Sequence, residues 1–278
     1  MTGGVINTIN TRLDADTIAY ILDHSDAKLL ITDTQFSPTM KKALKIYGKN
    51  IPIIDIHDDQ AVFKDGEGEQ IGEMTYEEFL QTGDDNYNWS LPEDEWQAIS
   101  LSYTSGTTGK PKGVVYHHRG SYLMSTGSVT AWNMPNKLTF LYTVPMFHCN
   151  GWGYPWTAAL IHAKIICCRY IVAKDIYNLI DKYKVTHFGG APIVLSLIAN
   201  ADEKDKKEIN HKVYVLTAGA PPTSAILEKM DNLGFEVMHV YGLTETYGHI
   251  LQCAWNEEWE SQSKSEKADI KARQGVRY

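Results

Sequence analysis

Apolar residues along the chain follow two spacings, which predict two kinds of element. Where they recur every three or four positions, as at Ile18, Ile21 and Leu22, they form one face of a helix. Where they form short runs bounded by polar residues, they predict buried strands. The helical pattern occurs at residues 16–26, 117–131, 152–162, 175–183, 192–200 and 222–233. The strand pattern occurs at residues 28–32, 51–56, 99–104, 138–144, 164–168, 186–188, 213–217 and 235–240.

Strands and helices alternate in two runs, so the sequence predicts an α/β fold of mainly parallel sheets with helices on both faces. We expect two related βαβ-type subdomains, residues 1–135 and residues 136–278. Residues 1–15 show no clear first strand, and residues 274–278 end without a capping element. We therefore expect a fold that is truncated at both ends.

Two local patterns add detail to this outline. Thr75 and Glu78 have the spacing of a capping box, which predicts that a short helix begins there. Residues 257–273 are highly charged, which predicts a solvated helix or loop, with a partner-binding segment as the alternative.

Charge and composition exclude several classes of protein. The chain has 278 residues and a net charge of −8, from 34 acidic and 26 basic residues, whereas nucleic-acid binders usually present a basic face. Its four cysteines form no CxxC pair, which fits a reduced, cytoplasmic compartment. No apolar run approaches the roughly 20 residues of a membrane span, and no secretory segment follows Met1.

The stretch from Tyr103 to Gly113 mixes hydroxyl side chains, glycines and lysines, as polyphosphate-binding loops do. Glycine lets the backbone approach a ligand, hydroxyls and amides donate to phosphate oxygens, and lysines add positive charge. The stretch is not a Walker A loop, because two residues separate its first glycines and Lys110 is followed by Pro111. We predict a mobile phosphate-binding flap; the alternative is a surface loop rich in small residues.

Three predicted strand ends deliver loops to one rim of a parallel sheet, where ligands bind in open sheets. The strands are those ending at Thr104, Thr217 and Val240. The loop after the second contains Gly219, Ala220 and Pro221, a small and flat wall that suits a purine; the alternative is a plain turn in which Pro222 begins a helix.

The segment from Tyr241 to Glu245 follows the third of these strands. Tyr241 is suited to stacking on a base, and Thr244 to hydrogen bonding with a phosphate. Glu245 supplies the oxygen ligand that Mg²⁺ prefers. The alternative is an ordinary strand and turn with Thr244 as a helix N-cap.

Aromatic residues and glycines alternate from Pro145 to Trp156, a composition that lines pockets for apolar organic groups. His148 has no second ligand at a metal-binding spacing, so we do not predict a metal site there. The alternatives are a structural, hydrogen-bonded His148 and core positions for Trp152 and Trp156.

Together these segments resemble the adenylate-forming superfamily, which contains acyl-CoA synthetases, peptide-synthetase adenylation domains and firefly luciferase. Residues 104–113, 147–152 and 241–245 carry the resemblance, and residues 219–221 support it. Residues 5–13 and 274–278 are also similar to the acyl-CoA synthetase branch. The resemblance covers essentially the whole chain and implies the N-terminal domain of such an enzyme.

The resemblance implies an AMP-forming acid–thiol ligase that uses ATP, Mg²⁺ and coenzyme A. A carboxylate attacks the α-phosphate of ATP and releases pyrophosphate, and the thiol of coenzyme A then displaces AMP. The nucleotide would contact Thr104, Ser105, Gly106, Thr107, Thr108, Gly109, Lys110, Lys112, Gly219, Ala220, Pro221, Tyr241, Gly242 and Thr244. The acid would contact His148, Gly151 and Trp152, and Mg²⁺ would lie at Thr104 and Glu245. The catalytic residues would be His148, Thr244 and Glu245.

The chain also departs from this family. A ribose-binding aspartate and a C-terminal lid domain with its lysine lie further along in the family, and only 33 residues follow Glu245 here. We therefore expect a largely inactive fragment. The substrate would be a short-chain, medium-chain or aryl carboxylic acid, and the resemblance also admits a homodimer in the full-length parent. The alternatives are a non-catalytic remnant that binds a nucleotide or a partner, and an adenylation domain that loads a carrier protein.

Overall fold

The computed structural model describes residues 3–64, 66–104 and 109–277, which fall into two compact units. The first unit is Met1–Val115 and the second is Tyr116–Tyr278. The sequence pattern predicts a division near residue 135, whereas the structure divides the chain before helix α4 (His118–Ala131). The reason is packing: Val129 and Trp132, at the end of this helix, belong to the same apolar cluster as Phe140 and Tyr154 of the second unit.

The first unit contains two small sheets. One has the strand order β1-β5-β6, and the other has the order β2-β3-β4 with parallel pairing throughout. The elements are β1 (Ile6–Asn7), α1 (Ala15–His24), β2 (Leu30–Asp33), η1 (Thr34–Phe36), α2 (Ser37–Tyr47), β3 (Ile53–Ile56), β4 (Met74–Thr75), α3 (Tyr76–Gln81), β5 (Ala98–Thr104) and β6 (Lys112–His117), the last of which runs into the second unit.

The helix predicted from Ile18, Ile21 and Leu22 is α1, and these three side chains are buried. Its N-cap is Asp14, whose carboxylate accepts a hydrogen bond of 2.8 Å from the amide of Thr17. Ile18 and Leu22 pack in one apolar cluster that also contains Met40 and Ala43 of α2 and Leu30 of β2. The apolar face of α1 thus builds the core of this unit, as the spacing predicts.

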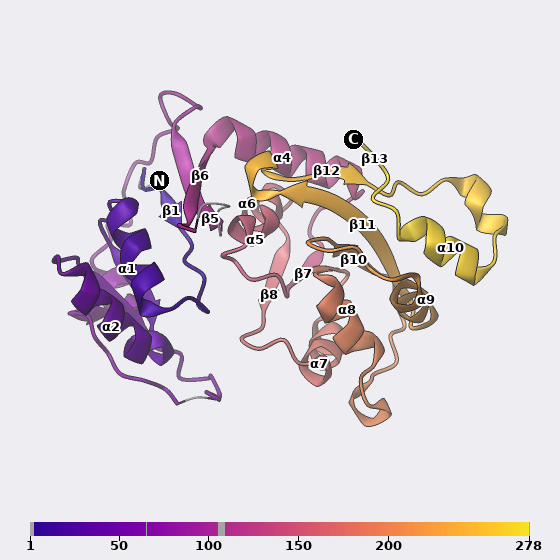
Figure 1. Ribbon diagram of the computed structural model, residues 1–278, viewed down its shortest axis with the longest axis horizontal. Helices are drawn as coiled ribbons and strands as arrows, with labels where there is room; N and C mark the ends of the chain where they lie inside the picture. The colour runs from indigo at the N-terminus through magenta and orange to yellow at the C-terminus, as the bar shows by residue number, and fades with distance from the viewer. Residues whose placement is uncertain (1–2, 65, 105–108, 278) are drawn as a thin grey trace. The chain divides into compact units, whose positions relative to one another are not determined.

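The second unit is built around one seven-stranded sheet of order β13-β12-β11-β10-β9-β7-β8 (Figure 1). Its strands are β7 (Thr139–Tyr142), β8 (Lys164–Cys167), β9 (His187–Gly190), β10 (Val213–Thr217), β11 (Phe235–Leu243), β12 (Gly248–Gln252) and β13 (Val276–Arg277). Its helices, with the short 3₁₀ turns, are α4, α5 (Cys149–Trp152), α6 (Tyr154–Leu160), α7 (Ala173–Tyr183), α8 (Pro192–Ala199), η2 (Glu203–Asp205), α9 (Ser224–Asn232), η3 (Thr244–Thr246), η4 (Glu257–Ser261) and α10 (Lys264–Lys271).

Alternate side chains of the central strands enter two separate cores, so helices cover both faces of this sheet. Val213 and Val215 of β10 pack with α7, α8, α9 and α10, whereas Leu216 of the same strand packs on the other face with Tyr154 of α6 and Trp132, which follows α4. The five strands from β8 to β11 pair in parallel. The predicted α/β class, with mainly parallel strands and helices on both faces, is confirmed.

The edges of the sheets differ from the sequence pattern in three places. Residues 1–15 do contain a strand, because Ile6 and Asn7 pair in parallel with β5. Residues 276–277 form β13, which pairs antiparallel with β12. The strand predicted to end at Val240 continues to Leu243 and pairs antiparallel with β12. Such short or edge strands have few apolar residues, so the hydrophobic pattern does not reveal them.

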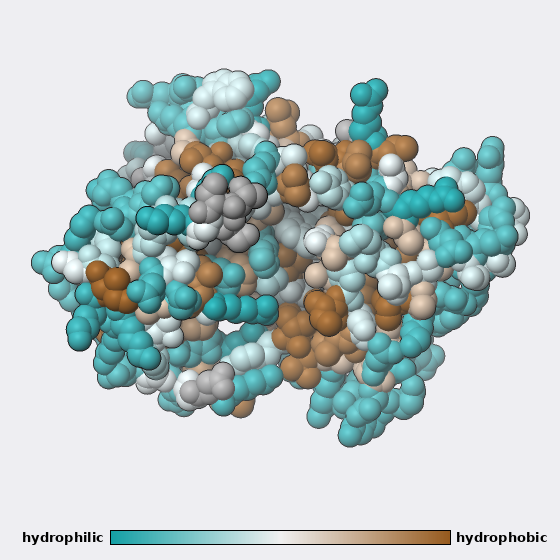
Figure 2. Space-filling model, in the orientation of Figure 1, coloured by the Kyte–Doolittle hydropathy of each residue, from teal (hydrophilic) through white to brown (hydrophobic). Residues whose placement is uncertain are grey.

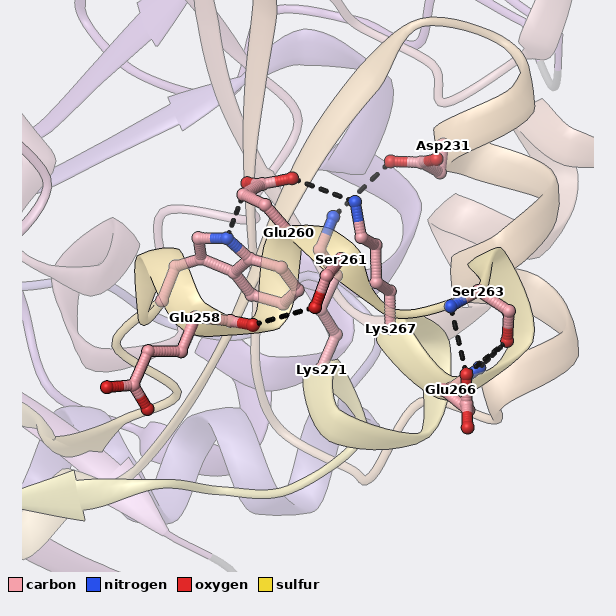
Figure 3. A network of polar contacts seen from close by, with 9 residues as sticks. Asp231, Glu258, Glu260, Ser261, Ser263, Glu266, Lys267 and Lys271 are labelled. Atoms are coloured by element: carbon pink, nitrogen blue, oxygen red, sulfur yellow. Dashed lines mark hydrogen bonds and ion pairs between the residues drawn. The ribbon is translucent and has the colours of Figure 1, made fainter.

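Capping residues fix several helix starts. The capping box predicted at Thr75 and Glu78 is confirmed, and Ser263 and Glu266 form a second one at the start of α10 (Figure 3). Helix α9 begins at Ser224 with Thr223 as its N-cap, so the helix predicted from Pro222 starts two residues later.

The charged segment 257–273 folds into η4 and α10, and a polar network joins these two helices to each other and to α9 (Figure 3). Lys267 joins α10 to η4 through a 2.8 Å contact with Glu260, and Lys271 reaches Asp231 of α9 at 3.4 Å. Glu260 also accepts a 2.6 Å hydrogen bond from the indole of Trp255. Because Ala268 of α10 is buried in the core, this segment is part of the fold as well as part of its charged surface.

The visible surface in Figure 2 is mostly hydrophilic, with separate apolar patches. Exposed large apolar side chains include Ile193 and Leu197 of α8 and Tyr122 and Leu123 of α4. Within the described part of the chain, no helix has the length and apolar character needed to cross a bilayer.

We predict that acidification below pH 6.5 destabilises the fold through His187 and His249. Burial lowers the pKa of each imidazole from 6.5 to about 4. Below pH 6.5 the unfolded chain therefore binds protons that the folded chain does not, so the free energy of unfolding falls by up to about 1.4 kcal/mol per pH unit per histidine, until about pH 4. Urea unfolding at several pH values should show this slope, and His187→Gln should reduce it. An unchanged slope in that variant would contradict the assignment.

Candidate functional site

Three loops of the second unit leave the sheet at the same rim. Strands β7, β9, β10 and β11 run in parallel, so their carboxyl ends lie on one edge. The loop after β7 carries His148, the loop after β10 carries Gly219, and the end of β11 carries Tyr241. This arrangement follows from the register: Thr217 at the end of β10 pairs with Gly190 of β9 and with His239 of β11. The rim is where ligands bind in open parallel sheets.

The loop after β7 contains a left-handed turn. Five consecutive residues, Cys149 to Gly153, have positive φ values between 43° and 75°, and three of them are not glycine. Left-handed backbone is strained for residues with a Cβ atom, costing of the order of 1–2 kcal/mol each. The helix predicted from Trp152 therefore begins only at Tyr154, as α6. Such strain persists only where surrounding contacts hold it.

Tyr142 of β7 holds this turn from below. Its hydroxyl donates a buried hydrogen bond of 3.1 Å to the carbonyl oxygen of Gly151. A Cβ atom at Gly151 would lie 2.5 Å from that hydroxyl, so only glycine fits. Thr143, the next residue, donates to the carbonyl oxygen of Gly189 and ties the end of β7 to β9. The turn is therefore packed closely against the end of β7, which is itself tied to β9.

The turn contacts the loop that follows β11. The thiol of Cys149 lies 3.5 Å from Oγ1 of Thr244, toward which it donates, and the hydroxyl of Tyr116 donates a 2.6 Å hydrogen bond to the backbone carbonyl of Thr244. The ring of Tyr247 stacks on Tyr116 with centroids 4.2 Å apart. Two segments that are distant in the sequence, and were predicted to act together, therefore meet at Thr244.

Burial and a neighbouring negative charge keep the Cys149 thiol and the Tyr116 hydroxyl protonated where they contact Thr244. The pKa of Cys149 is raised, mainly because burial disfavours the thiolate, and the carboxylate of Glu245 raises it further. The hydrogen bonds that Cys149 makes with Thr244 and Tyr116 act in the opposite direction but do not cancel this effect. Burial also raises the pKa of Tyr116. Cys149 is therefore a hydrogen-bonding thiol rather than a ready nucleophile.

Glycine is required beside Tyr241 for a packing reason. A Cβ atom at Gly242 would collide with the backbone of Gly248 in β12, at a point where the pairing register shifts. The close approach of these two strands sets the position of η3, on which Thr244 is half-buried and Glu245 is exposed. Tyr241 is half-buried at the same place, and Gly219, Ala220 and Pro221 are exposed in the loop after β10.

His148 is exposed and immediately precedes the turn, at the N-cap position of α5. Its ring contacts Phe147 at a centroid distance of 4.7 Å. Trp152 packs against the apolar cluster of α4 and α6, and its ring lies next to Gly189 at the end of β9. Trp152 is thus partly a core residue, which was one of the two alternatives for it.

A small hollow lies behind Cys149 and Tyr116. Its volume is about 10 Å³, close to the space for one water molecule. Seven residues line it: Tyr116, Ser121, Met124, Cys149, Gly153, Trp156 and Tyr247. Trp156 ends the segment that was predicted to line a pocket. Ser121, Met124 and Tyr247 were not predicted from the sequence, because only the packing of α4, α6 and the loop after β11 brings them together.

The predicted phosphate loop lies in the first unit, and Ser105, Gly106, Thr107 and Thr108 fall outside the described residues. Thr104 ends β5, and Lys112 begins β6 and is exposed. Gly109 has a φ of 91°, a left-handed value suited to glycine.

Two residues of α1 contact the flanks of this loop, and the sequence pattern did not select them. His24 Nδ1 lies 2.7 Å from the hydroxyl of Tyr103, and Nζ of Lys110 lies 5.6 Å from the centre of the Tyr20 ring. Tyr20 also donates a 3.4 Å hydrogen bond to the carbonyl of Pro111. They occupy the polar face of an amphipathic helix, where a contact of this kind leaves no periodic signal.

Glu245 and the neighbouring hydroxyl of Thr244 fit a Mg²⁺ ion that is held mainly by the phosphate oxygens of a substrate. Among the described residues no three His, Cys, Asp or Glu side chains gather into a metal site. Mg²⁺ often binds through one or two carboxylates plus phosphate oxygens and water, and Glu245 is an exposed carboxylate next to a hydroxyl.

Comparison with known proteins assigns the chain to a family. The profile of the AMP-binding enzyme family matches residues 1–270. A peroxisomal acetate/butyrate–CoA ligase of Arabidopsis thaliana is 44% identical over the whole chain, and an acetate–CoA ligase of Humulus lupulus is 45% identical. A 2-methylpropanoate–CoA ligase of Humulus lupulus is 39% identical over 99% of the chain. The chain covers 50% of each of these proteins, so it spans about half the length of the curated relatives it matches.

Solved structures share the fold. A luciferase-like enzyme from the mealworm Zophobas morio matches 94% of this chain and 57% of its own, with a TM-score of 0.75 and 19% identity. The O-succinylbenzoate coenzyme A synthetase of Bacillus subtilis, determined in complex with ATP and magnesium ion, matches 93% of this chain and 48% of its own, with a TM-score of 0.69 and 21% identity.

We predict that Gly151→Ala destabilises the second unit more than Gly153→Ala does. Both glycines have positive φ, so both substitutions strain the backbone by about 1 kcal/mol. Only the Cβ at 151 also meets the buried Tyr142 hydroxyl, whereas the Cβ at 153 meets nothing closer than 3.9 Å. The extra overlap should cost about 1–3 kcal/mol in the free energy of unfolding. Equal losses in urea titrations of the two variants would show that the Tyr142 contact does not hold the turn.

Proposed function

Since this chain belongs to the family of AMP-binding enzymes, we propose that it supplies the ATP- and acid-binding part of a carboxylic acid–CoA ligase. The reaction joins a short-chain carboxylic acid to coenzyme A in two steps. The acid's carboxylate oxygen attacks the α-phosphorus of ATP, and the bond to pyrophosphate breaks. The thiol of coenzyme A then attacks the acyl carbon, AMP leaves, and a thioester remains.

One observation supports this proposal above the others: the contact between the loop after β7 and the loop after β11. Cys149 and Tyr116 both hydrogen-bond with Thr244. Exposed His148 therefore immediately precedes a turn that adjoins the hydroxyl of Thr244 and the carboxylate of Glu245. A ligand with an acyl group at the first loop and a phosphate at the second would span this contact.

Each residue has a role in the proposal. Thr244 donates a hydrogen bond to the α-phosphate, and His148 donates one to the carboxylate oxygen or to the α-phosphate, where negative charge gathers during attack. Gly219, Ala220 and Pro221 present a flat, exposed surface to adenine, and Tyr241 stacks on it. The segment from Thr104 to Lys112 holds the β- and γ-phosphates. Glu245, with Thr104, holds Mg²⁺, which neutralises phosphate charge when bound.

The names of the relatives favour coenzyme A over a carrier protein as the thiol substrate, and short acids over long or aryl ones. We propose acetate to butyrate as the range. The proposed compartment is the cytoplasm, in keeping with the free cysteines, although the Arabidopsis relative is named as peroxisomal.

We predict that Glu245→Gln weakens binding of ATP to this chain only when Mg²⁺ is present. Loss of a charged ligand to the metal should raise the Kd for ATP at least about tenfold, because contacts to charged groups contribute roughly 1.5–3 kcal/mol. With the metal chelated, Kd should match that of the unsubstituted chain. Isothermal titration calorimetry measures both conditions.

Glu258→Gln is the matched control, since it makes the same change in a carboxylate on another 3₁₀ turn of the second unit. It should leave ATP binding unchanged in both conditions. A loss in Glu245→Gln that persists in chelator, or an equal loss in Glu258→Gln, would refute the assignment of Glu245 to the metal.

A further inference from the structure

The hollow behind Cys149 adjoins the junction at which the acid is proposed to react. Two of its walls, Cys149 and Tyr116, are the same two side chains that hydrogen-bond with Thr244. The other walls come from α4, from the start of α6 and from Tyr247. A carbon chain that extends from a carboxylate beside Thr244 and passes Cys149 would therefore enter this hollow.

Met124 of α4 occupies the space into which the hollow would otherwise extend. A Cβ atom at Gly153 would lie 3.9 Å from Cγ of Met124, and a Cβ atom at Gly248 would lie 2.6 Å from its Cε. The methionine side chain thus reaches from the start of α6 to the start of β12, over two glycines that leave it room. Methionine is flexible and fills irregular gaps, so it forms a movable wall.

Ser121 adds a polar feature to the same hollow. It is 5% exposed, and its hydroxyl has no hydrogen-bond partner among the described residues. The hollow has room for about one water molecule, which would satisfy this hydroxyl. A ligand tail long enough to expel that water would leave the hydroxyl unpaired, which is unfavourable.

We propose, on the basis of the function proposed above, that this hollow receives the tail of the acid and that Met124 limits the length of that tail. The methyl group of acetate reaches no further than Cys149, so acetate binds without displacing the water in the hollow. Each further methylene has to enter the hollow, where it displaces the water at Ser121 and then Met124. Met124 of α4, with Gly153 and Gly248 facing it, then determines the specificity for short acids. Trp152 does not line the hollow and does not set the length of the tail.

The test uses stable analogues of acyl-adenylates: acetyl-, butyryl- and hexanoyl-sulfamoyladenosine. Their Kd values are measured by calorimetry on the 278-residue chain with Mg²⁺ present. The unsubstituted chain should bind the acetyl compound at least about tenfold more tightly than the hexanoyl compound. Met124→Ala should reduce that ratio about tenfold or more, because each accommodated methylene contributes about fourfold in affinity.

Leu123→Ala is the matched control, since it shortens the neighbouring side chain of α4, which is 53% exposed. It should leave the ratio unchanged. Ser121→Ala provides a second test that does not depend on the folding of Met124→Ala, and it should improve binding of the hexanoyl compound by several-fold.

An unchanged ratio in both Met124→Ala and Ser121→Ala, with the analogues still bound, would overturn the inference and leave the proposed function standing. A shift produced by Trp152→Ala alone would likewise overturn it. If the folded chain binds neither AMP nor any of the three analogues, the proposed function fails, and this inference fails with it.

Discussion

The hydrogen bond from Tyr142 to the carbonyl oxygen of Gly151 is the interaction on which the candidate site depends. Without a buried donor at that point, five successive residues would have no reason to remain in left-handed backbone. The turn puts Cys149 against Thr244 and leaves exposed His148 at its entrance. A relaxed loop of the same length would separate these groups, and the loops after β7 and β11 would no longer share a ligand.

Most of the fold follows from the pattern of apolar residues. A continuous apolar run at residues 213–216 and helical spacing at Ile176 and Ile180 predict a sheet with two covered faces. What the pattern omits is short, polar or irregular: the edge strands, the antiparallel return of β12, and the left-handed turn. The turn contains Cys149 and Trp152, residues with no preference for positive φ, so its shape comes largely from tertiary contacts and not from local propensity.

The candidate site was foreseeable to the extent that its residues carry their own chemistry. Thr244, Glu245 and His148 have polar groups that suggest a role, and the parallel topology places their loops at one rim. Met124, Ser121 and Tyr247 gain meaning only from their neighbours, because an isolated methionine or serine on a helix signals nothing. The same holds for Tyr20 and His24 beside the predicted phosphate loop. The proposed ligand site uses residues of both kinds, but only those with reactive polar groups of their own could be predicted from the sequence.

The contact between Cys149 and Thr244 also offers the most direct measurement of whether the two loops form one ligand site. Cys149 is half-buried there, whereas Cys167 is exposed on β8, the strand at the edge of the sheet. The rate of alkylation of each cysteine by iodoacetamide at mildly alkaline pH can be followed by peptide mass spectrometry. Saturating acetyl-sulfamoyladenosine with Mg²⁺ should slow the labelling of Cys149 and leave that of Cys167 unchanged. Equal labelling of Cys149 with and without the bound analogue would contradict a shared site at these loops.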